Sequence, residues 1–116
     1  MDNQRYCLSL ELQDDDELIH QYEQYHQPGN VWPEILDSIR ESGIENMQIF
    51  RLGTQLVMVL DVAPHFSFEA KAKADGANPK VQQWERLMER FQRVDSTQAN
   101  AGKWQVMEEI FQLDAH

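Results

Sequence analysis

Residues 45–62, ENMQIFRLGTQLVMVLDV, form the stretch that decides the fold. The second part, 55–62, is almost continuously apolar, which is typical of a central strand covered on both faces. The first part, 45–52, alternates in character: Met47 and Ile49 share one face with Arg51. Between them, Gly53-Thr54 places glycine at the first of two central turn positions, which favours a type II′ hairpin. The stretch therefore predicts two adjacent antiparallel strands.

Working outward, the chain adds one strand near each end and helices in between. Residues 5–12 alternate, with Tyr6, Leu8, Leu10 and Leu12 on one face. The remaining predicted elements are helices at 17–26, 33–42, 66–75 and 79–94, and a last strand at 104–113. The order βαββαβ predicts an α+β, ferredoxin-like fold, with helices on one face of a four-stranded antiparallel sheet.

Helix boundaries carry recognisable signals. Asn78-Pro79 combines a capping side chain with proline at a first helical position. The acidic run 14–17 precedes the first helix, where a helix N-terminus favours negative charge. We interpret this run as capping and not as a metal site, so no metal is predicted.

The uncovered face of the predicted sheet needs a partner. The strand at 55–62 is apolar on both sides, but the helices cover only one of them. A second copy packing sheet to sheet is the simplest solution, so the sequence predicts a homodimer.

Composition narrows the class of protein. A chain of 116 residues predicts one domain, 1–116. The net charge of −10 disfavours nucleic acid or an anionic membrane surface as partner, and no apolar run is long enough for a membrane helix. The single cysteine, Cys7, cannot form an internal disulfide, which indicates a reducing cytoplasm. Because no Cys/His cluster or phosphate-binding glycine loop is present, any chemistry is predicted to need no cofactor.

The candidate chemistry lies in residues 17–36, ELIHQYEQYHQPGNVWPEIL. Tyr22 and His26 are four residues apart on a predicted helix, so their side chains are neighbours. Histidine exchanges protons near neutral pH, and a tyrosine hydroxyl can bind a substrate oxygen. His20 falls on another face and is a weaker candidate. The alternative is that Tyr22 and His26 are merely half-buried surface residues.

Nearly the whole chain resembles the L-rhamnose mutarotase family. The specific parts are Tyr22-x-x-x-His26, then Trp32-Pro33-Glu34, Gln82-Gln83-Trp84 and the terminal Glu109-Ile110-Phe111-Gln112-Leu113. Members are cofactor-free enzymes that interconvert the anomers of 6-deoxy-L-sugars and fold as dimeric α+β barrels. The resemblance implies a monosaccharide substrate, His26 as catalytic proton donor, and Tyr22 and Trp84 as sugar contacts.

The chain also departs from the family's best-known members. Met47 stands where they have a second tyrosine, Glu85 where they have a second tryptophan, and the spacer from His26 to Trp32 is two residues longer. These changes alter the wall of the implied pocket, and we interpret them as favouring L-fucose slightly over L-rhamnose. The predicted sugar-binding set is Tyr22, Trp84, Glu85, Met47 and Trp32.

Several alternatives stay open on the sequence. The base that opposes His26 is His65, Glu85 or a water molecule. A different class of function is a non-catalytic ligand-binding or interaction module, which ferredoxin-like dimers also provide. A third is a dimeric-barrel oxygenase, which would need a larger apolar cavity than polar Gln82, Gln83 and Glu85 suggest.

Overall fold

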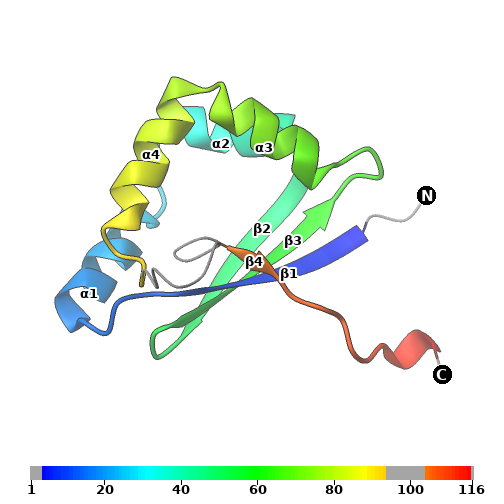
Figure 1. The fold of residues 1–116 in the computed structure, drawn as a ribbon, viewed down its shortest axis with the longest axis horizontal. Coiled ribbons are helices and arrows are strands. Elements are labelled where there is room, and N and C mark those ends of the chain that lie inside the picture. Colours follow the sequence, from blue (N-terminus) through cyan, green and yellow to red (C-terminus); the bar gives the residue numbers. More distant parts are fainter. Residues whose placement is uncertain (1–3, 94–103, 116) are drawn as a thin grey trace.

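A computed structural model describes residues 4–93 and 104–115. The elements, in order, are β1 (Gln4–Glu11), α1 (Asp16–Tyr25), α2 (Pro33–Glu41), β2 (Ile44–Leu52), β3 (Gln55–Val62), α3 (Phe68–Gly76), α4 (Pro79–Glu89), β4 (Gln105–Val106) and a 3-10 turn at Leu113–Ala115. The sheet order is β2-β3-β1-β4 with every neighbouring pair antiparallel. Figure 1 shows α2, α3 and α4 over one face of this sheet and α1 at the end of the strands, next to the end of β1. The predicted ferredoxin-like α+β fold is confirmed.

The hairpin forms as the sequence predicts. β3 lies between β1 and β2, and Gly53 has a φ of 61°. A type II′ turn has a positive φ only at its first central residue, and Thr54, the second, accordingly has no positive φ. Alternate β3 residues from Leu56 to Val62 are buried beneath the helices, whereas Val57 and Val59, on the opposite face, are only half-buried. In a single copy, β3 is therefore covered on one face and partly open on the other.

The last strand is much shorter than predicted. The sequence pattern predicts a strand over 104–113, but β4 contains only Gln105 and Val106, and one more amide, that of Met107, donates to the Cys7 carbonyl. Continuing the register that pairs Leu8 with Val106 would place residue 110 opposite the first residue of β1. A strand reaching Leu113 would thus outrun its neighbour. The C-terminal segment instead extends away from the body of the molecule (Figure 1).

The helix boundaries confirm the capping interpretation. The Asp15 carboxylate accepts from the backbone amides of Glu17 and Leu18, at 3.0 and 3.1 Å. Asn78 caps α4 in the same way, and Pro79 follows it. None of the helices in the described ranges is long and apolar enough to cross a membrane.

Buried residues gather in two unequal clusters beneath the helices. We call the larger one the closed end, made of Leu10, Leu12, Ile19, Tyr22, Ile35, Leu56, Val81, Trp84, Met88 and Phe91. The smaller one, the open end, is made of Leu8, Ile44, Met58, Leu60 and Val62. Helices α1, α2 and α4 all contribute buried side chains to the closed end, whereas α3 has no buried residue. The helix layer is therefore loosely packed on one side.

Candidate active site

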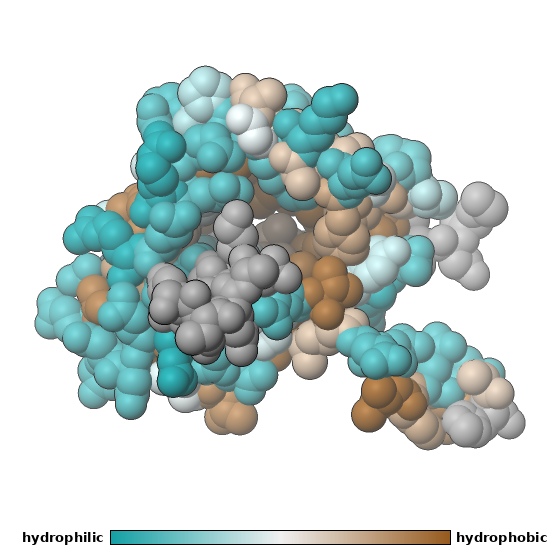
Figure 2. All heavy atoms as spheres, in the orientation of Figure 1, coloured by the Kyte–Doolittle hydropathy of each residue, from teal (hydrophilic) through white to brown (hydrophobic). Residues whose placement is uncertain are grey.

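A pocket of about 420 Å³ lies between the sheet and the helices, where the two clusters meet. Its sheet side is apolar and includes Leu8, Met47 and Met58, while charged side chains line it from α3 and α4. Figure 2 shows a hollow beneath the helix layer, with hydrophobic atoms inside and polar atoms around it. A volume of this size is in the range that holds a small organic ligand.

Tyr22 and His26 both line this pocket, at the end of α1. Their ring centroids are 4.2 Å apart, and His26 Nδ1 lies 2.7 Å from the Tyr22 carbonyl oxygen. A carbonyl can only accept, so Nδ1 carries a proton and donates it. Nε2 is therefore the nitrogen that remains available for proton exchange.

Burial sets the protonation states of this pair. Desolvation lowers the pKa of His26, and the hydrogen bond to the Tyr22 carbonyl opposes that shift only in part. The imidazole is accordingly neutral at pH 7, with Nε2 as an acceptor. Burial also raises the pKa of Tyr22 well above its usual range, so its phenol stays protonated and can donate.

The structure places the two tryptophans of the predicted set differently. Trp84 lines the pocket beside His26, with ring centroids 5.8 Å apart. Trp32 is not among the residues that line it. Its ring packs edge to face on Trp84 at 5.2 Å, which holds Trp84 in position. Trp32 thus supports a wall residue without reaching the cavity.

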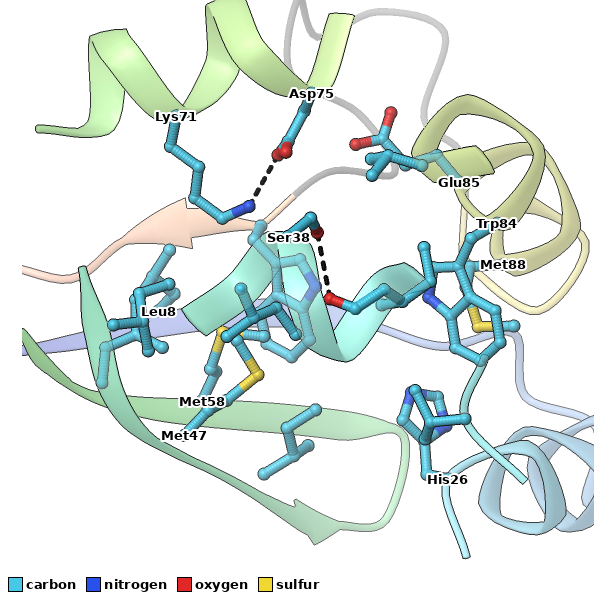
Figure 3. A pocket seen from close by; sticks show the side chains of 18 of the residues that line it. Leu8, His26, Ser38, Met47, Met58, Lys71, Asp75, Trp84, Glu85 and Met88 are labelled. Atoms are coloured by element: carbon cyan, nitrogen blue, oxygen red, sulfur yellow. Dashed lines mark hydrogen bonds and ion pairs between the residues drawn. The ribbon is translucent and has the colours of Figure 1, made fainter. Parts of the chain in front are cut away.

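Met47 and Glu85, the two substituted residues among the departures from the family, both line the pocket. Met47 comes from β2 and lies on the sheet side, while Glu85 comes from α4 (Figure 3). His65 and His20 are exposed and lie outside the pocket, and the His65 ring packs against Gly43. Of the two side chains considered as the opposing base, His65 and Glu85, only Glu85 therefore lines the cavity.

Sequence reasoning missed Glu89 of α4, which lines the pocket, and two charged side chains of α3 that also line it, Lys71 and Asp75. With Phe68, which also lines the pocket, they recur at i, i+3 and i+7 along the helix, which is the spacing of one helical face. The signal was present, but an apolar residue followed by two charged ones does not look like a buried face. No group of three or more His, Cys, Asp or Glu side chains placed to hold a metal is found in residues 4–93 and 104–115.

The arrangement suits acid–base chemistry on a small amphipathic molecule. It offers a proton-exchanging nitrogen, a phenol donor, a flat indole and an apolar floor within one cavity. Those features define a small α+β enzyme whose reaction moves protons, and comparison with known proteins gives its family.

The family model of L-rhamnose mutarotase matches residues 5–113. An L-fucose mutarotase from Xanthomonas campestris pv. campestris is 43% identical over 113 residues, covering 97% of this chain and 90% of its own. A UPF0734 protein from Dictyostelium discoideum is 35% identical, covering 97% and 92% respectively. The crystal structure of an L-rhamnose mutarotase from Formosa agariphila has the same fold, with a TM-score of 0.69 at 19% identity over 95% of this chain and 98% of that one.

The chain therefore belongs to the L-rhamnose mutarotase family. It is an aldose mutarotase of the L-fucose/L-rhamnose type, an isomerase that interconverts sugar anomers.

Proposed function

We propose that this protein interconverts the α and β anomers of a 6-deoxy-L-hexose, with L-fucose favoured over L-rhamnose, by acid–base opening of the sugar ring in the pocket. The observation that carries the proposal is the held imidazole: Nδ1 of His26 donates to the Tyr22 carbonyl at 2.7 Å, which leaves Nε2 for the sugar. The apolar floor suits the C6 methyl group and the C–H face of such a sugar.

The mechanism assigns one proton movement to His26. Neutral Nε2 accepts the proton of the C1 hydroxyl while the ring oxygen is protonated, and the C1–O5 bond breaks to give the open aldehyde. Rotation about C1–C2 and reclosure form the other anomer, with His26 returning its proton to O1. His26 is thus the proton donor in the closing step. The phenol of Tyr22 binds a sugar oxygen, and Trp84 offers its ring face to the C–H groups.

The ring oxygen needs a second group as its proton source. Of the groups considered as the base opposing His26, His65 lies outside the pocket, which leaves Glu85 or a bound water as the second group that exchanges a proton with the sugar. General acid–base catalysis is typically worth about 10² to 10⁴-fold, which is sufficient for a reaction that already proceeds without an enzyme.

Two observations support L-fucose as the preferred sugar. Met47 and Glu85, which replace aromatic residues of the best-known members, both line the pocket. The relative at 43% identity is named an L-fucose mutarotase. A pocket that matches one arrangement of hydroxyls leaves polar groups unpaired with another arrangement, which costs about 1–3 kcal/mol for each group.

Saturation-transfer NMR on equilibrated sugar tests the reaction, because it measures exchange between the two anomeric protons without net conversion. We expect exchange with wild type, loss of most of the rate in His26→Ala, and a smaller loss in Tyr22→Phe. Retained rate in His26→Ala would remove His26 from the mechanism. If the wild type exchanges neither sugar, the chain is a ligand-binding module. Turnover of L-rhamnose more than about tenfold faster than L-fucose would reverse the sugar preference.

A homodimer is part of the proposal. Large apolar side chains are exposed on the open sheet face and on the C-terminal segment: Phe50, Leu52, Met107, Ile110, Phe111 and Leu113. Exposed apolar surface of this extent indicates a partner, and a second copy packing on the open face would cover Val57 and Val59 as well. Light scattering at micromolar concentration should return twice the monomer mass of 13.6 kDa, and the monomer mass itself would contradict the dimer.

A further inference from the structure

We propose that Lys71 and Asp75 of α3 bind ring hydroxyls of the sugar and determine which sugar the pocket accepts. The inference rests on the proposed function and adds two specificity-determining residues to it. Lys71 and Asp75 form an ion pair whose position is explained neither by helix stability nor by surface electrostatics.

The pair reaches into the pocket from the side opposite His26. Lys71 Nζ lies 2.8 Å from Asp75 Oδ2, and both residues line the cavity. In Figure 3 the two side chains come from α3 above the cavity, while His26 lies below it. The backbone carbonyl of Asp75 accepts from Gln82 Nε2 of α4 at 3.0 Å, which fixes this end of α3.

Helix stability does not account for the pair. Asp75 is next to the last residue of α3, where the partial negative charge of the helix end disfavours a carboxylate. A Lys preceding its acidic partner by four residues is also the weaker of the two orientations for such pairs. The charges are therefore placed against the preferences of their own helix.

Surface electrostatics does not account for it either. The side chains of Lys71 and Asp75 are 19% and 18% exposed, whereas those of Arg5 and Asp61, in a surface pair, are 68% and 26% exposed. Withdrawing two charges from water costs free energy that their mutual attraction often fails to recover. A charged pair kept beside an apolar floor indicates a role in binding a polar ligand.

The chemistry of the pair matches neighbouring hydroxyls. An ammonium group has three donors, of which the pair uses one, and a carboxylate has a second oxygen to accept with. A donor and an acceptor side by side can bind two adjacent hydroxyls, one accepting from Lys71 and the other donating to Asp75. With the reacting carbon beside His26, the hydroxyls far from C1 meet α3. L-Fucose and L-rhamnose differ in their ring hydroxyls, so this contact distinguishes them.

The test measures anomer exchange against sugar concentration for L-fucose and for its analogues lacking the 2-, 3- or 4-hydroxyl. We expect Lys71→Met and Asp75→Asn to raise the KM for L-fucose between about tenfold and a hundredfold with kcat within about threefold, because charged hydrogen bonds to the bound sugar are lost. Removing the recognised hydroxyl from the sugar should raise the wild-type KM similarly. In the variants the same removal should add little, since the partner is already gone.

Lys73→Met is the matched control, because Lys73 is an exposed lysine of the same helix that does not line the pocket. Its KM should stay within about twofold of wild type. If Lys71→Met lowers the midpoint of thermal unfolding, Asp75→Asn, which keeps the size of the side chain, decides the matter. Unchanged KM in a folded Asp75→Asn, or additive effects with every analogue, overturns this inference alone. Absence of exchange by the wild type overturns the proposed function with it.

Discussion

The two ends of the helix-covered face differ in how they are built. At the closed end, α1 and α4 press apolar side chains onto β1 and β3, and Phe91 is only 1% exposed. At the open end, α3 lies over five buried residues of the sheet, but α3 itself has no buried residue. The closed end thus stabilises the fold, and the open end leaves room for a ligand. His26 and Trp84 lie at the boundary between the two ends. Helices α1 and α4 of the closed end hold them, and their side chains line the pocket.

The largest expected effect is at the closed end. Phe91→Ala removes a fully buried ring that contacts Tyr22 and Tyr25. Such substitutions cost about 3–5 kcal/mol of unfolding free energy, through lost apolar burial and the cavity left behind. Urea denaturation at a fixed protein concentration measures it. A loss below about 1.5 kcal/mol would show that the closed end does not carry the stability.

A smaller effect is expected at the open end. Phe68 is half-buried and packs against Tyr6 and Phe66, with ring centroids 4.9 Å away in each case. Phe68→Ala should cost about 1–2 kcal/mol, since only part of the ring and its aromatic contacts are lost. The same denaturation series, at the same concentration, gives the comparison. Equal losses in Phe68→Ala and Phe91→Ala would abolish the distinction between the two ends.

The smallest expected effect is the pH dependence of the exchange rate, which is set by His26 at the boundary between the two ends. Burial lowers the pKa of His26 below its ordinary value of about 6.5. The exchange rate should therefore be level through neutral pH and fall only when Nε2 becomes protonated, at a midpoint below about 6.5. A fall of the rate between pH 8 and 7 would contradict the buried, neutral form.

The free energy of unfolding should also depend on pH through His26. Below about pH 6.5 the unfolded chain binds a proton at His26 that the folded chain does not, so acidification through this range destabilises the fold. His26→Gln should lose less stability than wild type over the same range, because its side chain does not titrate. Parallel curves for the two proteins would mean that the pKa of His26 is not lowered by folding.

The sequence predicted most where local chemistry determines structure. The turn at Gly53 and the caps at Asp15 and Asn78 follow from short patterns and are confirmed. The predicted length of the last strand was wrong because that length depends on where β1 begins, and no pattern within 104–113 contains this information.

The candidate site was only partly predictable for the same reason. Tyr22 and His26 are neighbours on one helix, so spacing alone places them together. Lys71 and Asp75 reach the pocket only because α3 crosses over the open end, and that crossing is a property of the whole fold. Trp32 entered the predicted set through its motif, whereas its position behind Trp84 depends on packing between helices.

The hydrogen bond from His26 Nδ1 to the Tyr22 carbonyl also limits where protons can travel. A ring tied at one nitrogen cannot pass a proton through itself, because the second nitrogen has no vacancy to fill or empty. Whatever Nε2 receives from the cavity must leave by the same route, back into the cavity. Such a residue takes up a proton and returns it on the same side, and no proton passes through the ring to the helix behind it. The substrate and the product of anomer exchange have the same number of protons, so returning the proton to the sugar is sufficient for the reaction.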